Sequence, residues 1–246
     1  MITYKKSDYH GFERLDFTFN GKNAILVCPN ERKGHNRFLM KMEYFTDFPE
    51  LEIEMLKRGY HVAYLENRNR WGVDADCDDK AAFCDFLSAT FYLYRRCIPV
   101  GMSCGGFHAV NFASRYPDYV SLMYLDAPLL SFLSLPMGCG VVPRSDGVFP
   151  EITEAYGFDW AHALAYAEQP VHRLPKVIAN KIPVALVYGD ADDTVNCQEN
   201  ALILLEMYEA AGAPIKAWAK AGCNHHPHGP LQYMDEVIAF IEENMR

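Results

Sequence analysis

A serine flanked by glycines is the first group in this sequence with a recognisable chemical pattern. Ser103 stands in the run Gly-Met-Ser-Cys-Gly-Gly at 101–106, which follows a predicted strand and precedes a predicted helix. A serine on such a tight turn is exposed, and side chains at Gly101 and Gly105 are expected to collide with the neighbouring strand and helix. The helix that follows directs backbone N–H groups at the turn, which favours a developing oxyanion. The pattern predicts a nucleophilic serine.

Two later loops offer the partners that such a serine needs, because a serine hydroxyl is a weak nucleophile until a base takes its proton. The run Gly-Asp-Ala-Asp-Asp-Thr-Val at 189–195 follows a predicted strand at 184–188. The run Gly-Cys-Asn-His-His-Pro-His at 222–228 follows a predicted strand at 215–219. The order serine, aspartate, histidine, each at the carboxyl end of a strand, predicts a catalytic triad.

Strand and helix patterns alternate along most of the chain, which predicts the elements that would position this triad. Repeated strand–helix units are typical of a mostly parallel sheet with helices on both faces, so we expect one α/β domain over 1–246. The predicted strands cover 14–19, 24–28, 62–65, 100–102, 120–125, 184–188 and 215–219, and the predicted helices cover 49–58, 76–94, 105–116, 200–211 and 230–244.

The segment 127–181 interrupts this rhythm. It holds six prolines, a Gly-Cys-Gly stretch and a helical pattern around 160–168. Because ligands bind α/β sheets at the carboxyl edge, where this segment begins, we expect a cap insertion whose apolar residues face Ser103. The alternative is a surface excursion without a role.

Four motifs together resemble the α/β-hydrolases, and the resemblance extends over nearly the whole chain. They are the serine turn at 101–106, Asp-Ala-Pro at 126–128, Gly-Asp-Ala-Asp at 189–192 and the histidine-rich run at 222–228. Within that superfamily the chain is similar to a bacterial group of hydrolases near the prolyl oligopeptidases and dienelactone hydrolases. The resemblance implies the α/β-hydrolase fold and a Ser-Asp-His triad, and it leaves the substrate open.

The acid of the triad has several candidates. In the α/β-hydrolases the acid usually lies three residues after the loop glycine and three before a valine, and that spacing selects Asp192. Asp190 and Asp193 are the rivals in the same loop, where solvation or helix capping would also explain an aspartate. Asp126, at the end of another predicted strand, is a further alternative.

The base is expected to be His225, which aligns best with the histidine of the family. His226 and His228 are expected to orient the loop or to line the cleft. Three histidines at this spacing also suggest a metal, but adjacent residues and a stiff Pro227 make a shared ion awkward, and no companion carboxylate or cysteine has a recognised ligand spacing. We therefore predict no metal and no other cofactor.

The oxyanion formed during catalysis needs two backbone donors. The first is expected to be the N–H of Cys104, directly after the nucleophile. The second is expected in the loop that follows the strand at 24–28. Pro29 has no N–H, so Asn30 or Glu31 is the candidate there.

Two tryptophans lie on segments that are expected to rim the cleft. Trp71 and Trp160 are candidates for stacking on an aromatic or sugar group of the substrate, with His226 as a third substrate contact. Ordinary loop packing is the alternative for both indoles.

Composition narrows the functional class. Lys and Arg number 23 against 32 Asp and Glu, and the net charge of −9 argues against nucleic-acid and anionic-membrane partners. The longest clean apolar stretches are around five residues, where a membrane span needs about twenty, and the N-terminal residues lack a signal-peptide pattern. Eight cysteines without CxxC spacing are typical of reduced thiols, so we expect a cytoplasmic protein.

These observations favour a serine hydrolase that acts on a small carboxylic ester through an acyl-enzyme, with Ser103, His225 and Asp192 as nucleophile, base and acid. A peptidase of the prolyl-oligopeptidase type is the nearest alternative. It ranks lower because the large extra domain of those peptidases is not found in this sequence. A non-catalytic binding protein on a hydrolase scaffold is the alternative of another class.

Overall fold

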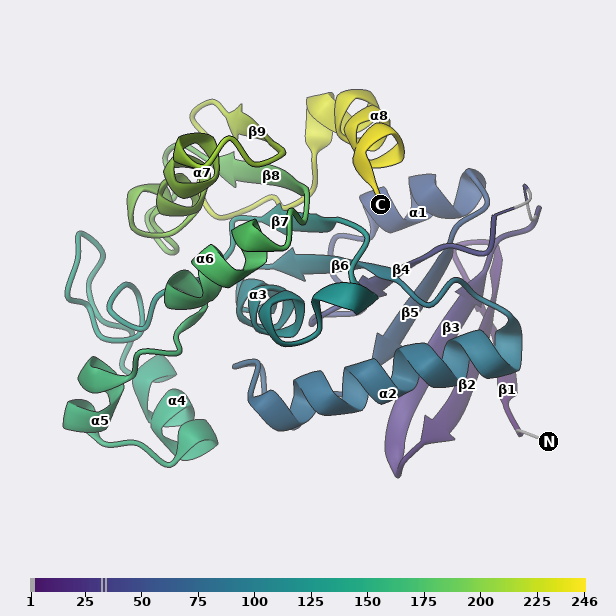
Figure 1. Ribbon diagram of the computed structural model, residues 1–246, viewed down its shortest axis with the longest axis horizontal. Coiled ribbons are helices and arrows are strands. Elements are labelled where there is room, and N and C mark those ends of the chain that lie inside the picture. The colour runs from purple at the N-terminus through teal and green to yellow at the C-terminus, as the bar shows by residue number, and fades with distance from the viewer. Residues whose placement is uncertain (1–2, 32, 34) are drawn as a thin grey trace.

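A nine-stranded sheet forms the centre of the computed structural model, which describes residues 3–31, 33 and 35–246 (Figure 1). The last six strands across the sheet pair in parallel, whereas the first four pair antiparallel. The predicted mostly parallel sheet is therefore confirmed. In order across the sheet the strands are β1 (Lys5–Tyr9), β2 (Phe12–Phe19), β3 (Lys22–Cys28), β5 (His61–Leu65), β4 (Phe38–Lys41), β6 (Cys97–Met102), β7 (Met123–Asp126), β8 (Val184–Gly189) and β9 (Ile215–Lys220).

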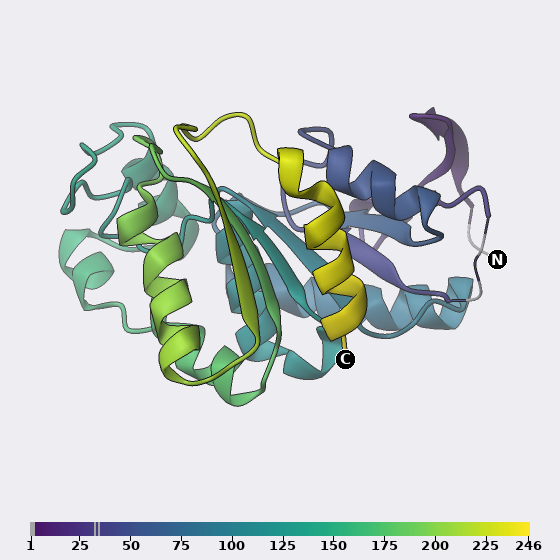
Figure 2. The same ribbon diagram turned by 90° about the horizontal axis from the view of Figure 1, so that it is seen from above.

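Helices cover both faces of the sheet, as predicted (Figures 1 and 2). Their apolar residues form two clusters, one on each side of the strands. None of the helices that the structure describes combines the length and the apolar composition needed to cross a membrane. One face carries α1 (Glu50–Lys57) and α8 (Met234–Asn244), and the other carries α2 (Asp74–Phe91), α3 (Gly105–Arg115), α6 (Pro170–Ala179) and α7 (Ala201–Ala210).

The parallel register brings the carboxyl ends of four strands to one edge. Met102 at the end of β6 lies opposite Asp126 at the end of β7, and Gly189 at the end of β8 lies opposite Lys220 at the end of β9. The segments that follow these residues therefore leave the sheet side by side. This edge is where ligands bind in α/β sheets.

Strand β4 was not predicted, and it changes the interpretation of the sheet. It holds only four residues, Phe-Leu-Met-Lys, and lies buried between β5 and β6. Its Lys41 is 2% exposed and forms an ion pair with Glu52 (2.5 Å). This charged residue interrupts the apolar run by which a buried strand is recognised in a sequence. The loop after β4, rather than the loop after β3, leads to the edge of the sheet that carries Ser103.

The segment 127–181 divides into two parts. Residues 127–169 include α4 (Val148–Tyr156) and α5 (Trp160–Ala165), which lie beyond the arrowheads of the central strands in Figure 1. Phe132, Phe149 and Ile152 pack there in one apolar cluster with Phe107 of α3. The remaining part is α6, which packs against α3 on a face of the sheet.

The glycines of the serine turn differ in the room around them. A Cβ on Gly101 would lie 2.8 Å from the Cβ of Ala109, so the expected collision at this position is confirmed. A Cβ on Gly105 would meet nothing closer than the Cβ of Glu43 at 3.6 Å, which is an ordinary contact. The prediction of a collision at Gly105 is therefore wrong, because the first turn of α3 leaves room for a methyl group beside the loop after β4.

This difference predicts that alanine substitutions at the two glycines have different effects on stability. Gly101→Ala should lower the free energy of unfolding by about 1–3 kcal/mol, because the methyl group overpacks the turn. The matched control Gly105→Ala should leave it unchanged or raise it by up to about 1 kcal/mol, since alanine favours the helix. Denaturant unfolding followed by circular dichroism measures both. Equal losses in the two variants would contradict this account of the turn.

Candidate active site

His225 joins two side chains at the carboxyl edge of the sheet. Its Nδ1 lies 2.8 Å from Oδ2 of Asp192, and its Nε2 lies 3.0 Å from Oγ of Ser103. With the Asp192 carboxylate as acceptor, Nδ1 carries the proton and Nε2 accepts from the serine hydroxyl. The structure thus brings together the three residues that the sequence predicted as nucleophile, base and acid.

The backbone at Ser103 holds its side chain up toward the histidine. Ser103 has a φ of +51°, in the left-handed region that non-glycine residues rarely adopt. Its N–H donates to the carbonyl of Asp126 (3.0 Å), and its carbonyl accepts from the N–H groups of Gly106 and Leu129 (2.9 Å each). Such strain persists where the surroundings over-determine it, and it is found at functional turns.

Asp192 is fixed by its own loop, which directs one oxygen at the base. Its Oδ1 accepts from the N–H groups of Thr194 (2.9 Å) and Val195 (2.8 Å). The side chain is buried, and Oδ2 is the oxygen that meets His225. The carboxylate therefore orients the imidazole without needing to move.

The two rival acids in this loop hold the neighbouring loop instead. Oδ1 of Asp190 accepts from the N–H of Gly222 (2.6 Å). The backbone N–H of Asp193 donates to Oδ1 of Asn224 (3.1 Å). Both residues thus tie the acid loop to the loop that carries the base.

Asp126, the third alternative acid, lies in a buried polar network beneath the base. Lys220 Nζ lies 3.4 Å from its Oδ1 and donates to the carbonyl of Pro227 (2.8 Å), and the N–H of Gly229 donates to Oδ2. Burial opposes the charge, but the nearby His228 and Lys220 outweigh it and lower the pKa of Asp126. Asp126 thus fixes the histidine loop rather than His225.

A cavity of about 440 Å³ opens above Ser103. Leu135, Ser145 and Val148 from the segment 127–169 form part of its wall, so this segment lies over the serine. The acid loop adds Val195 on the same wall. Apolar residues from two segments therefore line the cavity beside Ser103.

Solved structures share the fold of this chain at low sequence identity. An S-formylglutathione hydrolase from Agrobacterium tumefaciens superposes with a TM-score of 0.69 and 13% identity, over 98% of this chain and 99% of that one. The dipeptidyl peptidase 4 of Porphyromonas gingivalis superposes with a TM-score of 0.66 and 18% identity, over 99% of this chain and 35% of that one. The chain has the α/β-hydrolase fold.

The α/β-hydrolase fold is what these comparisons establish. The chain spans 36% of a Bacteroides ovatus protein named as a candidate dipeptidyl aminopeptidase IV, with a TM-score of 0.68 and 14% identity over all of this chain. It thus spans about a third of each dipeptidyl peptidase-type structure and nearly all of the S-formylglutathione hydrolase. No protein-family model matches the sequence, and no curated protein sequence matches it either.

Asn30 and Glu31, the expected oxyanion donors, lie away from the edge of the sheet that carries Ser103. They follow β3, which runs antiparallel to β5, so its carboxyl end is at the opposite edge of the sheet. Both are exposed, and Nδ2 of Asn30 donates to the carbonyl of Gly11 (3.2 Å). The prediction is therefore wrong, because it counted β3 as the strand next to the serine strand when that strand is β4.

Tyr44, in the loop after β4, is the residue that the sequence reasoning missed. It lines the cavity, and its hydroxyl interacts with the thiol of Cys104 and with Arg70. Burial raises the pKa of Tyr44, so the hydroxyl keeps its proton and remains a donor. Nδ2 of Asn67 donates to Oε2 of Glu43 (2.6 Å), the residue before Tyr44, and this hydrogen bond holds the loop in place. The short apolar run that begins at Phe38 was the signal that could have revealed it.

Cys104 lies where the first oxyanion donor is expected. It directly precedes α3 and lines the cavity next to Ser103. Burial raises the pKa of its thiol, which keeps the sulfur protonated at neutral pH. A protonated thiol is a weak nucleophile, so Ser103 is the better candidate for attack.

The two tryptophans do not line the cavity, so the prediction that they stack on the substrate is wrong. Trp71 is 1% exposed and packs edge-on against Phe107 (5.9 Å between ring centroids), because the large apolar indole is more stable in this core. Trp160 stacks on Phe149 at 4.1 Å between centroids. Arg70, next to Trp71 in the sequence, lines the cavity instead.

His226 lines the cavity, as predicted for a substrate contact. It is exposed, and its ring stacks on Phe48 with 5.5 Å between centroids and 18° between planes. Partial burial and the neighbouring imidazoles of His228 and His225 lower the pKa of His226. The ring is therefore a neutral wall of the cavity at neutral pH.

His108 on α3 supports the loop that presents Arg70. The ring is fully buried, and the N–H of Gly72 donates to its Nε2 (3.2 Å). Burial lowers the pKa of His108 to about 3. In the unfolded chain the pKa would be about 6.5, so between these two values only the unfolded state binds the proton.

The stability of the protein should therefore fall as the pH falls below 6.5. Between pH 6.5 and pH 5, His108 should remove about 2 kcal/mol from the free energy of unfolding, whereas above pH 6.5 it has no such effect. Denaturant unfolding at the two pH values, compared with His108→Gln, isolates this contribution because glutamine can accept the same N–H without titrating. An identical pH dependence in both proteins would contradict it.

Proposed function

We propose that this protein is a serine hydrolase that cleaves small carboxylic esters through an acyl-enzyme. The observation that carries the proposal is the position of His225 between Oγ of Ser103 (3.0 Å) and Oδ2 of Asp192 (2.8 Å). The α/β-hydrolase fold supports it, because the three residues follow strands in the order of that fold. A pure binding protein would have no need of all three groups in this geometry.

The reaction follows from the geometry in two halves. Oγ of Ser103 attacks the ester carbonyl carbon while Nε2 of His225 takes its proton, and the imidazolium is stabilised by Asp192. The tetrahedral intermediate expels the alcohol, which takes the proton back from His225. Water then attacks the acyl-enzyme with His225 again as base, and the carboxylic acid leaves with Ser103 restored.

The oxyanion of the intermediate would be held by two donors beside the serine. The N–H of Cys104 is the first, at the start of α3, where the helix end favours negative charge. The loop after β4 supplies the second through Tyr44, whose protonated hydroxyl lines the same cavity. This assignment replaces Asn30 and Glu31.

The wall of the cavity supports a short or medium acyl chain as the substrate group. Leu135, Val148 and Val195 form an apolar surface above the nucleophile, and apolar lining is what binds acyl groups in such pockets. The similar structures are a hydrolase of S-formylglutathione and two proteins of dipeptidyl peptidase type, so thioesters and peptides are also compounds worth testing.

Substitutions in the triad should separate its members. Ser103→Ala and His225→Ala should each lower kcat for 4-nitrophenyl acetate by about 10⁴- to 10⁶-fold, because the triad acts as a unit. Asp192→Asn should cost about 10³- to 10⁴-fold, since the geometry survives while the tautomer and the stabilising charge do not. The matched control Asp193→Asn, in the same loop, should retain nearly full activity. Retention of full activity in Ser103→Ala would refute the assignment of the nucleophile.

A substrate panel tests the choice of ester over peptide. We expect 4-nitrophenyl acetate and butyrate to be hydrolysed with a kcat/KM at least about 10²-fold above that for glycyl-prolyl 4-nitroanilide, because Leu135, Val148 and Val195 give the cavity an apolar surface that suits an acyl chain. The same measurement on Ser103→Ala corrects for background hydrolysis. A higher kcat/KM for the anilide would favour the peptidase alternative.

A further inference from the structure

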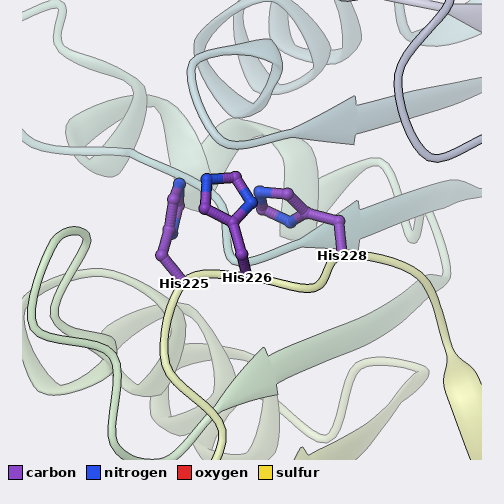
Figure 3. Close-up of side chains that lie close together, drawn as sticks. All are labelled: His225, His226 and His228. Carbon is purple, nitrogen blue, oxygen red and sulfur yellow. The ribbon is translucent and has the colours of Figure 1, made fainter.

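Three imidazoles from one loop converge beside the nucleophile (Figure 3). His225, His226 and His228 extend to the same side of the loop after β9, and all three line the cavity above Ser103. Their ligand nitrogens lie within 4.8 Å of one another. The triad uses only the first of these rings, so the role of the other two is not explained by hydrolysis.

Carboxylates from distant parts of the chain lie beside two of the three rings. Nδ1 of His225 meets Oδ2 of Asp192 at 2.8 Å, and Nδ1 of His228 lies 3.5 Å from Oδ1 of Asp126. Metal-binding histidines commonly pair one ring nitrogen with a carboxylate, which orients the other nitrogen toward the ion. The sequence suggested no companion carboxylate for a metal, because these two come from the end of β7 and from the loop after β8, far from the histidines in the sequence.

The distances are within reach of a single ion. Zinc binds imidazole nitrogen at about 2.0–2.1 Å, so at tetrahedral angles two nitrogen ligands of one ion lie about 3.4 Å apart. Separations of up to 4.8 Å therefore need to close by about 1.4 Å. His226 is exposed and lines the cavity, so rotation of its side chain can supply part of that movement.

We propose that this histidine cluster binds one divalent transition-metal ion, with Zn²⁺ as the best fit, and that the bound ion stops hydrolysis. Three neutral imidazoles suit zinc, copper or nickel, whereas magnesium and calcium require oxygen ligands. The ion would occupy the lone pair on Nε2 of His225 that accepts the proton of Ser103 (3.0 Å). The same nitrogen cannot serve both partners. The inhibition rests on the proposed function, and the binding does not.

The binding is tested on the metal-free protein by isothermal titration with Zn²⁺. Cys28, Cys139 and Cys223 are replaced by serine throughout, because these residues are exposed or partly exposed and their thiols would compete for the ion. We expect one Zn²⁺ per chain, and the same stoichiometry in Ser103→Ala, which keeps all three rings and has no hydrolytic activity.

Substitution of the ligands should then weaken the site. His226→Ala should raise the Kd for Zn²⁺ at least about tenfold, because loss of an outer-shell partner alone costs that much. His228→Ala should raise the Kd in the same way, provided that circular dichroism shows this variant to be folded. If it is not folded, His226→Ala alone decides the test, because His226 is exposed and its replacement should not disturb the fold. The matched control His172→Ala, an exposed histidine on α6, should leave the Kd unchanged. Absence of Zn²⁺ binding, or an unchanged Kd in His226→Ala, would overturn the proposal.

The effect on the reaction is measured with 4-nitrophenyl acetate. Zn²⁺ should abolish hydrolysis reversibly, with activity restored by EDTA, and Mg²⁺ at the same concentration should not. The Zn²⁺ concentration for half-inhibition should rise at least about tenfold in His226→Ala, relative to its own metal-free rate. Full activity with Zn²⁺ bound would overturn the inhibition. If the protein hydrolyses no ester, the titration still decides the binding, so the two proposals fail separately.

Discussion

The buried ion pair between Asp126 and Lys220 is the interaction on which the site depends. Both side chains are almost fully buried at the ends of β7 and β9, 3.4 Å apart. Lys220 also donates to the carbonyl of Pro227, and Asp126 accepts from the N–H of Gly229. Removal of one partner from such a pair typically costs about 3–5 kcal/mol, because the other charge is left buried and unpaired. The loop that carries His225 is therefore held by the sheet itself.

In the two proposals, that loop provides the same nitrogen atom of His225 for hydrolysis and for metal binding. Hydrolysis requires that Nε2 of His225 keep its lone pair for the proton of Ser103. The neighbouring rings of His226 and His228 bring further lone pairs to the same place, which is what a transition metal requires. The carboxylate of Asp192 orients His225 for both purposes, and the carboxylate of Asp126 lies 3.5 Å from Nδ1 of His228. An esterase built this way would be sensitive to free zinc.

The sequence predicted what local pattern encodes and missed what depends on neighbours in space. Ser103, Asp192 and His225 were predicted because each follows a recognisable strand, and the structure brings them together. Strand β4 was missed because it is short and ends in a buried lysine. Tyr44 was missed as a consequence, because it lies in the loop after that strand. Trp71 was misplaced because sequence position does not reveal whether a loop indole faces the cavity or the core. The contact between Asp126 and His228 was missed because it joins the end of β7 to the loop after β9, and these segments are brought together only by the sheet.

The central claim is that His225 activates Ser103 as a nucleophile, and covalent labelling tests it most directly. The protein is treated with a fluorophosphonate, digested, and the modified peptide is sequenced by mass spectrometry. The account predicts a single adduct on Ser103 that disappears in Ser103→Ala and forms far more slowly in His225→Ala. An adduct on another residue, or labelling of Ser103 at the same rate without His225, would contradict it.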